Sequence, residues 1–212
     1  MEDQLKNTSS VLSRPKIIVT GHANADFDCI ASMVAVQKLY PGSVLIYPGS
    51  KERAVKSFFM QGASILFDFR SPKEVDFSEV ELLVVVDTKQ KNRVSHVDAV
   101  FKNPNLRIHL FDHHPATNDD LQAEYSRTEM WGATVSILVE ELRKKNIELN
   151  RDEATLMGIG LYEDTGSLTF PATTEHDFIA AGWLRSQGMD LNTISEITRN
   201  TMTPDQVALL HT

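Results

Sequence analysis

Short apolar runs rich in β-branched residues alternate with helical patterns through the first half of the chain. Runs bounded by glycine, proline or polar residues predict buried strands, and they fall at residues 16–21, 44–47, 82–86 and 106–111, with a weaker one at 65–67. The run 82–86 contains only leucine and valine, which is typical of a central parallel strand buried on both faces.

Apolar residues at helical spacing predict helices between these strands and through most of the second half. The predicted helices cover residues 30–39, 51–61, 133–145, 151–162, 174–187 and 190–200, and residues 94–102 form a helix or turn. Residues 112–128 and 163–171 lack such a pattern and are predicted to be loops. Together these elements predict an α/β fold in which a parallel sheet is flanked by helices and the second half is mostly helical.

The 212 residues are enough for one large domain, or for one domain with an appendage. Residues 1–14 are polar and are expected to be a loose N-terminal lead-in, and residues 15–200 to be the globular domain. Residues 201–212 start a helical pattern with Pro204 in its first turn. We expect this last stretch to be the start of a linker helix that leads into a second domain absent from this sequence.

Composition limits the classes of function. A net charge of −8 argues against a broad nucleic-acid-binding surface, but a phosphate substrate stays possible because divalent ions invert the charge of an acidic site. The single cysteine, Cys29, excludes an intrachain disulfide. No apolar run approaches the roughly 20 residues of a membrane span, and residues 1–14 do not resemble a signal peptide. We therefore expect a cytoplasmic protein, with its oligomeric state left open.

Acidic and imidazole side chains follow three of the predicted strands. They are His22, Asp26 and Asp28 after the first, Asp87 after the central strand, and Asp112, His113 and His114 after the last. In a parallel sheet these positions share the carboxyl-terminal edge. Asp164, in the loop 163–171, would have to fold back over that edge. Carboxylates and imidazoles together predict a site for a pair of divalent ions.

Each of these residues taken singly also has a structural explanation. Asp26 and Asp28 could cap the following helix, Asp87 could end a strand in a turn, and Asp164 could belong to a capping turn. Three other histidines are not part of these clusters; we expect His96 and His109 to be strand or surface residues, and His176 could cap the helix that it starts. The joint occurrence of the acidic clusters, in order along one edge, favours the metal site.

Four motifs resemble those of the DHH phosphoesterase superfamily. They are HANADFD at residues 22–28, VDT at 86–88, DHH at 112–114 and EDTGS at 163–167. Residues 26–32 (DFDCIAS) and 38–41 (KLYP) are further similar to the N-terminal module of certain bacterial multidomain proteins. Those proteins join a DHH module to CBS domains and a tRNA nucleotidyltransferase or poly(A) polymerase. The resemblance implies the same parallel sheet flanked by helices.

The resemblance also implies roles for individual residues. The first metal would be held by His22, Asp26 and Asp87, and the second by Asp28, Asp87, His113 and Asp164. Manganese is the usual metal of the superfamily, and Mg²⁺ is the alternative. The implied catalytic residues are Asp87 as the shared ligand, Asp112 as the support of the His113 imidazole, and His114 facing the phosphate or the leaving group. Asn24 and Arg93 are weaker candidates for contacts to phosphate.

The implied activity is hydrolysis of a phosphodiester, in a short oligonucleotide or a cyclic dinucleotide, by a water that two metals activate. One alternative is hydrolysis of a phosphoanhydride, as in pyrophosphate or polyphosphate, by the same metal core. Another is a weakly active regulatory, nucleotide-binding module of a tRNA nucleotidyltransferase or poly(A) polymerase. Hydrolases of this superfamily carry a second domain with a glycine-rich, histidine-containing motif that binds substrate, and no such motif occurs in this sequence. Full activity and substrate choice are therefore expected to depend on further domains.

Overall fold

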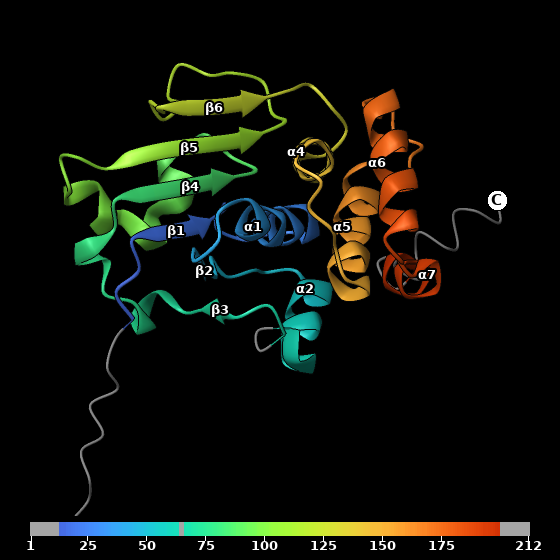
Figure 1. Ribbon diagram of the computed structural model, residues 1–212, viewed down its shortest axis with the longest axis horizontal. Helices are drawn as coiled ribbons and strands as arrows, with labels where there is room; N and C mark the ends of the chain where they lie inside the picture. Colours follow the sequence, from blue (N-terminus) through green and yellow to red (C-terminus); the bar gives the residue numbers. More distant parts are fainter. Residues whose placement is uncertain (1–12, 64–65, 200–212) are drawn as a thin grey trace, which may run out of the picture.

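The protein is built on a six-stranded sheet whose strands are all parallel. The computed structural model describes residues 13–63 and 66–199. The strands are β1 (Ile17–Thr20), β2 (Val44–Ile46), β3 (Phe69–Arg70), β4 (Leu82–Val86), β5 (Arg107–Asp112) and β6 (Tyr125–Thr128), in the order β3-β2-β1-β4-β5-β6. Their carboxyl ends therefore lie at one edge, where the arrowheads of Figure 1 meet the helical part of the protein.

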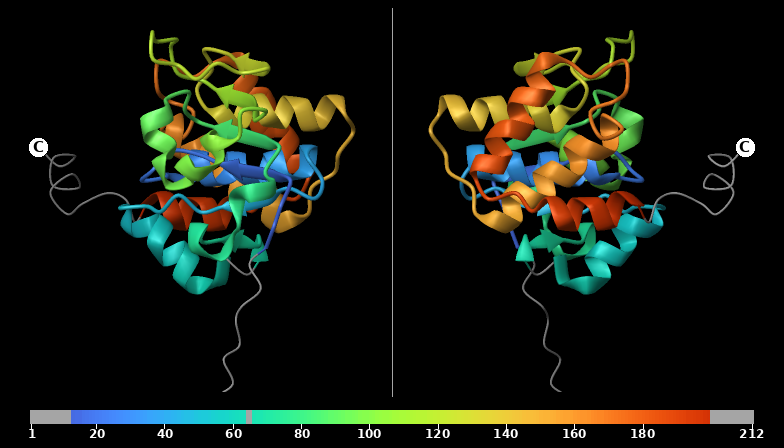
Figure 2. Two further views of the ribbon diagram at one scale, coloured as in Figure 1. Left: turned by 90° about the vertical axis from the view of Figure 1, so that its left-hand side faces the viewer. Right: turned by 90° about the vertical axis from the view of Figure 1, so that its right-hand side faces the viewer.

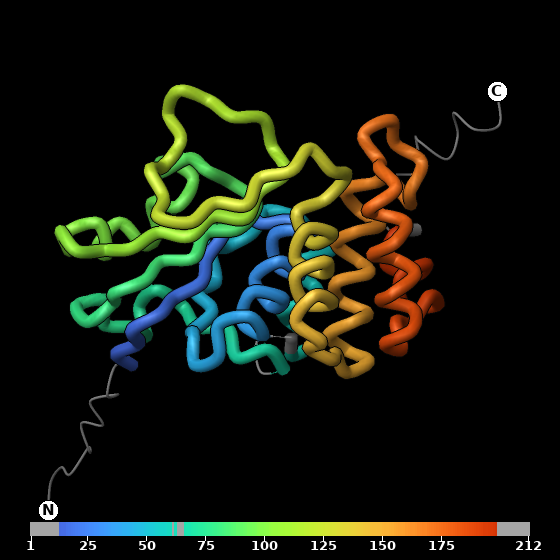
Figure 3. Tube along the Cα trace, turned by 45° about the horizontal axis from the view of Figure 1, so that its top comes forward, coloured from blue at the N-terminus to red at the C-terminus, as the bar shows by residue number. Residues whose placement is uncertain are grey.

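The helices lie on the sheet and beyond its carboxyl-terminal edge. The α-helices are α1 (Phe27–Leu39), α2 (Arg53–Phe58), α4 (Thr134–Lys144), α5 (Arg151–Asp164), α6 (Glu175–Ser186) and α7 (Leu191–Arg199). The shorter helical segments are the π turn η1 (Phe59–Ala63) and the 3₁₀ segments η2 (Pro72–Glu74), η3 (Phe77–Glu79) and η4 (Lys91–Lys102). Helices α4 to α7 lie side by side in Figure 3, and Figure 2 shows α2 at the side of the molecule opposite β6.

Alternate residues of the central strands face two separate apolar cores. Val19 and Val84 belong to the larger core, which α1, α4 and α5 complete. Ile18 and Leu83 belong to the smaller core, which η4 covers with three valines. Burial on both faces is what a parallel sheet requires, and it explains why residues 82–86 are uniformly apolar in sequence.

Helices α1 and α5 approach each other closely near the carboxyl-terminal edge of the sheet. A Cβ atom at Gly160 of α5 would lie 2.8 Å from the Phe27 carbonyl oxygen and 2.9 Å from the Asp28 Cα. Glycine is therefore needed for this contact, since a larger residue would push the two backbones apart. The contact brings the carboxyl end of α5, with Asp164, beside the first turn of α1.

The fold class predicted from the sequence is confirmed, and several element boundaries are wrong. Residues 125–128, predicted as loop, form β6 and pair with β5; this mostly exposed edge strand has no apolar run to reveal it. The weak strand predicted at 65–67 is replaced by β3 at Phe69–Arg70. Helix α1 starts at Phe27 rather than residue 30, and α5 extends to Asp164 rather than ending at residue 162. Asp28 and Asp164 are thus helical residues.

Some predictions fall on residues outside the described ranges. They are the lead-in up to residue 12, the weak strand at Ile65, the helix end at Asn200 and the linker helix at 201–212. Within the described residues, no helix has the length and apolar character needed to cross a bilayer.

Candidate metal centre

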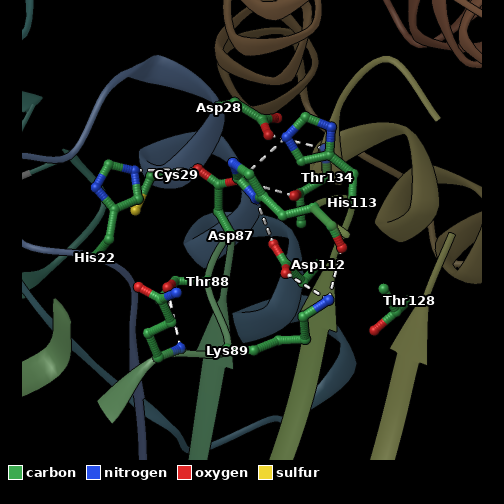
Figure 4. Close-up of polar contacts among 12 residues, drawn as sticks. His22, Asp28, Cys29, Asp87, Thr88, Lys89, Asp112, His113, Thr128 and Thr134 are labelled. Carbon is green, nitrogen blue, oxygen red and sulfur yellow. Dashed lines mark hydrogen bonds and ion pairs between the residues drawn. The ribbon is translucent and has the colours of Figure 1, made fainter. Parts of the chain in front are cut away.

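Asp87 lies at the centre of the predicted site, between two groups of ligand-type side chains. It follows β4 with φ of 57°, and its N–H donates to the Phe111 carbonyl at 2.9 Å, which continues the ladder with β5. Its Oδ2 lies 3.2 Å from His22 Nε2, whereas its Oδ1 lies 3.6 Å from His113 Nε2 and 3.7 Å from His114 Nδ1. The two oxygens of one buried carboxylate therefore face two different groups (Figure 4).

The first group consists of His22, Asp26 and Asp87. His22 Nε2 lies 3.5 Å from Asp26 Oδ2, and its Nδ1 donates to the Ala23 carbonyl at 3.1 Å. This backbone contact fixes the ring so that Nε2, the nitrogen a metal would take, faces the carboxylates. Burial opposes a charge on His22, but hydrogen bonds to Asp26 and Asp87 raise its pKa to about 10. A divalent ion would displace the Nε2 proton and neutralise the same carboxylates.

Cys29 lies close to this first group, although we did not predict it from the sequence as a site residue. Ligand atoms of Cys29, His22 and Asp87 all lie within 4.8 Å of one another. Burial, together with the charges of Asp87 and Asp26, raises the pKa of the thiol well above its usual value. The sulfur is therefore protonated, and the Asp26 carboxylate is the better ligand for a hard ion.

The second group consists of Asp28, His113 and Asp164, whose ligand atoms all lie within 4.8 Å of one another. His113 Nε2 lies 3.2 Å from Asp164 Oδ2, and its Nδ1 donates to the Trp131 carbonyl at 3.1 Å. As at His22, a backbone carbonyl orients the ring with Nε2 toward the carboxylates. Asp164 does fold back over the sheet edge, as predicted, because it ends helix α5.

Two helix amino termini point at carboxylates of the site. Asp28 accepts from the Thr134 and Val135 N–H groups of α4 at 2.8 and 2.9 Å, and so caps a helix 106 residues away in sequence. At α1, Asp26 accepts from the Cys29 N–H at 2.9 Å and Glu163 from the Phe27 N–H at 2.7 Å. The positive ends of both helix dipoles therefore favour negative charge at the site.

Even so, the carboxylates outnumber the cations that face them. Burial and the charges of Asp87 and Asp164 raise the pKa of Asp28 well above its usual value. Burial and the charge of Asp87 raise the pKa of Asp164 to about 8, and burial raises that of Glu163 to about 8 as well. Buried acidic groups that repel one another are a suitable environment for divalent cations, whose charge would remove the repulsion. The donor set therefore fits a metal pair.

The DHH triplet divides differently from the prediction. Asp112 Oδ1 accepts from His114 Nδ1 at 2.8 Å, and Asp112 Oδ2 forms an ion pair with Lys89 Nζ at 3.3 Å. The prediction that Asp112 supports the His113 ring is wrong, since the Trp131 carbonyl takes that place. Asp112 ends β5 with its side chain fully buried, and His114 follows with a side chain that is 46% exposed. Asp112 thus supports the imidazole that solvent can reach.

The chain is similar to known proteins both in sequence and in fold. Residues 16–161 match the DHH family, N-terminal domain. The chain belongs to the DHH family. Its sheet and helices also resemble the crystal structure of an exopolyphosphatase-related protein from Bacteroides fragilis, with a TM-score of 0.69 at 18% identity over 92% of this chain and 59% of that chain.

Curated relatives of this DHH chain include enzymes of several names. An A-adding tRNA nucleotidyltransferase of Geobacter sulfurreducens is 39% identical over 92% of this chain and 22% of its own length. A bifunctional oligoribonuclease and PAP phosphatase of Mycoplasma genitalium is 26% identical over 90% of this chain and 59% of its own length. A probable manganese-dependent inorganic pyrophosphatase of Listeria innocua is 28% identical over 78% of this chain and 53% of its own length. The chain thus spans between about a fifth and three fifths of these relatives.

Of the weaker candidates, Arg93 is near enough to the DHH site for its charge to act on two of the site residues. The Arg93 carbonyl accepts from the Ala23 N–H at 2.7 Å, and its side-chain charge acts on Asp26 and His114. Asn24 is exposed at the tip of the same loop with φ of 65°. A phosphate contact for either residue stays a prediction.

The remaining described histidines lie outside both groups. His109 is on β5, as predicted, and its Nδ1 pairs with the Tyr40 hydroxyl at 2.8 Å. His96 is on η4 rather than a strand and is half-buried, with its Nε2 2.6 Å from Thr20 Oγ1. His176 is in the first turn of α6, where Thr174 is the cap and the His176 ring stacks on Trp131 at 3.9 Å.

Four residues of the DHH site were not singled out from the sequence. Thr134 Oγ1 donates to Asp87 Oδ1 at 3.0 Å, the Trp131 carbonyl holds His113, Glu163 caps α1 and Lys89 pairs with Asp112. Glu163 lies inside a quoted motif and could have been found there. Lys89 and Thr134 could not, because only tertiary packing brings a lysine or a threonine against these carboxylates.

The site predicts that metal and pH act together on stability. Asp164 and Glu163 have raised folded pKa values of about 8, so the stability they contribute is complete below about pH 4 and is lost as pH rises through 8. Mn²⁺ removes this loss and itself binds better once the ligands are deprotonated. At a concentration 100 times its Kd, Mn²⁺ is expected to raise the free energy of unfolding by about 2.7 kcal/mol. This corresponds to a rise in Tm of roughly 5–10 °C at pH 8.

Thermal unfolding in EDTA and in Mn²⁺, at pH 5 and at pH 8, measures this effect. The rise in Tm with Mn²⁺ is expected to be clearly smaller at pH 5. Equal rises at both pH values would mean that the titrating carboxylates do not take part in metal binding.

Proposed function

We propose that this DHH domain is a divalent-metal-dependent phosphoesterase that hydrolyses a phosphodiester in a short oligonucleotide or a cyclic dinucleotide. The observation that carries the proposal is the position of Asp87. Its Oδ2 faces His22 and its Oδ1 faces His113, at 3.2 and 3.6 Å from the ring nitrogens. A single carboxylate shared in this way is the arrangement expected of a two-metal phosphoryl-transfer site.

Two sets of ligands follow from this geometry. His22, Asp26 and Asp87 would hold the first ion, and the second would be held by Asp28, Asp87, His113 and Asp164. Mixed oxygen and nitrogen donors suit Mn²⁺, with Mg²⁺ as the alternative, and the relative named as a manganese-dependent pyrophosphatase supports the same choice. When bound, the ions lower the pKa of a shared water and neutralise charge on the phosphate oxygens.

His114 is the residue placed to move a proton in the reaction. Its hydrogen bond to Asp112 raises its pKa, and burial opposes this effect. As the half-exposed member of the triplet, His114 can donate a proton to the leaving-group oxygen of a bound phosphodiester. We further propose Arg93 and Asn24 as contacts to the phosphate; the charge of Arg93 acts on Asp26 and His114, which supports its part in this.

Two other activities are possible on the same scaffold. Hydrolysis of pyrophosphate or polyphosphate would use the same ligands, because the metal pair recognises a phosphoryl group rather than its substituent. The similarity to the Geobacter nucleotidyltransferase, of which this chain matches 22%, favours a nucleotide-binding module within a longer protein. On that reading further domains would supply the substrate contacts, and the catalytic rate of this domain alone would be low.

Turnover with Mn²⁺ on a panel of a dinucleotide, a cyclic dinucleotide and pyrophosphate tests the proposal. We expect the highest kcat/KM on one of the two phosphodiesters. His114→Ala is expected to lower kcat by about 10²–10⁴-fold, the usual contribution of general acid–base catalysis, with both ions retained. His109→Ala, on the strand β5 that precedes His114 but outside the site, is the matched control and should keep the wild-type rate.

The panel also separates the alternatives. A preference for pyrophosphate would support the phosphoanhydride hydrolase. Binding of nucleotide without turnover of any substrate by wild-type protein, including the longest natural form of the chain, would support the regulatory module and reject the enzyme.

A further inference from the structure

Lys89 is a buried lysine two residues beyond Asp87. Its side chain is 7% exposed, and its Nζ donates to the His114 carbonyl at 2.6 Å. The same Nζ lies 3.3 Å from Asp112 Oδ2 and 4.0 Å from Asp120 Oδ2. Burial of a lysine is costly unless its charge is paired and its donors are satisfied. Here the one hydrogen-bond acceptor and both paired carboxylates belong to the strand end and loop that carry His114.

Lys89 is linked to His114 at two points, directly at the main chain and indirectly at the imidazole ring. The main chain is held directly, through the short hydrogen bond to the His114 carbonyl. The ring is held through Asp112, whose Oδ2 pairs with Lys89 while its Oδ1 accepts from His114 Nδ1 at 2.8 Å. Figure 4 shows the Lys89 side chain, from the segment that follows β4, directed toward Asp112. One side chain thus fixes the position of the imidazole and of the carboxylate that orients it.

The loop after His114 is tied to the same residue through its backbone. The Leu121 N–H donates to the Lys89 carbonyl at 2.7 Å, and Gln90 and Asp120 form an isolated antiparallel bridge. Asp120 in turn accepts from the N–H and the hydroxyl of Thr117 at 2.9 and 2.7 Å. The half-exposed His114 therefore lies at the start of a loop that follows β5 and is also held by backbone contacts to Lys89 and Gln90.

We propose that Lys89 is a positioning residue for phosphoester cleavage, holding the His114 imidazole at the metal site through the His114 carbonyl and Asp112. The proposal rests on the proposed function for the rate effects. Lys89 itself is too buried to touch substrate, so it acts through His114. A lysine that served only to neutralise Asp112 would stabilise the fold without affecting His114, and the two roles predict different results.

A double-mutant cycle separates these roles. Lys89→Met keeps most of the side-chain volume and removes the charge and the donors. We expect kcat to fall on the order of 10²-fold, as for a displaced catalytic group, with KM changed less than about threefold and both Mn²⁺ ions retained. In the His114→Ala background the same change should have no further effect on kcat, because the group it positions is already gone. Lys91→Met, at an exposed lysine two residues away, should leave kcat unchanged.

An equal fall in kcat in both backgrounds would overturn the proposal, and so would loss of the metal ions in Lys89→Met. Lys89→Arg, which keeps a charge and donors, is expected to restore at least a tenth of the wild-type kcat. Lys89→Gln, which removes the charge, replaces Lys89→Met in the cycle if the latter does not fold.

A second measurement does not depend on turnover. In wild-type protein labelled with ¹³C and ¹⁵N, the Lys89 ammonium protons should exchange slowly and show coupling across the hydrogen bond to the His114 carbonyl carbon. Fast exchange without this coupling would refute the contact. If wild type cleaves no substrate of the panel, the proposed function fails while this measurement still decides the position of His114.

Discussion

Asp87→Ala is expected to remove both divalent ions and to reduce phosphoester hydrolysis to background. The reason is that one Asp87 oxygen faces each ligand group. Asp87 is also only 2% exposed, so a carboxylate from the protein surface cannot take its place. Loss of either ion alone would remove positive charge that a phosphoryl-transfer site needs to stabilise the phosphate oxygens. Equilibrium dialysis with Mn²⁺, followed by elemental analysis of the protein, measures the number of ions bound.

Two variants control for effects unrelated to the shared ligand. Asp87→Asn keeps the volume and tolerates the left-handed backbone at φ of 57° better than alanine does; we expect it to lose metal affinity as well, because an amide is a neutral and weaker ligand. Asp152→Ala, at an exposed aspartate of α5, should bind metal as wild type does. Two tightly bound ions in Asp87→Ala would exclude the shared position of this carboxylate.

Asp28→Ala is expected to destabilise the metal-free protein by about 2–6 kcal/mol, since two buried N–H groups at the start of α4 lose their acceptor at about 1–3 kcal/mol each. Both Asp28 oxygens accept from that helix, at 2.8 and 2.9 Å. For a chain of this size the loss corresponds to a fall in Tm of roughly 5–20 °C. Urea unfolding in EDTA measures it without any contribution from metal.

The same variant also tests the division of ligands. Asp28 belongs to the second group alone, so Asp28→Ala should lose one ion and keep the other, in contrast to Asp87→Ala. Asp152→Ala again serves as the control, with a change in stability within about 0.5 kcal/mol. Wild-type stability of Asp28→Ala in EDTA would show that the α4 amino terminus finds another acceptor.

Local sequence patterns were enough to predict the central strands and most helices. The run at β4 predicts a doubly buried strand because every position is apolar. Strand β6 was missed since its exposed residues lack alternation, and β3 was misplaced since only two residues pair. The failures are at sheet edges, where little apolar surface is buried and the sequence carries little signal.

For the site, the sequence alone determined which residues gather at one edge. His22, Asp87 and His113 each follow a strand, and parallel strands bring such positions together whatever the details of packing. Only the tertiary structure decided how they pair. Asp28 caps a helix 106 residues away, and Asp112 supports His114 rather than His113 while also pairing with a buried lysine. Backbone periodicity is encoded locally, but side-chain partners depend on helix contacts between distant segments, and no local pattern specifies these.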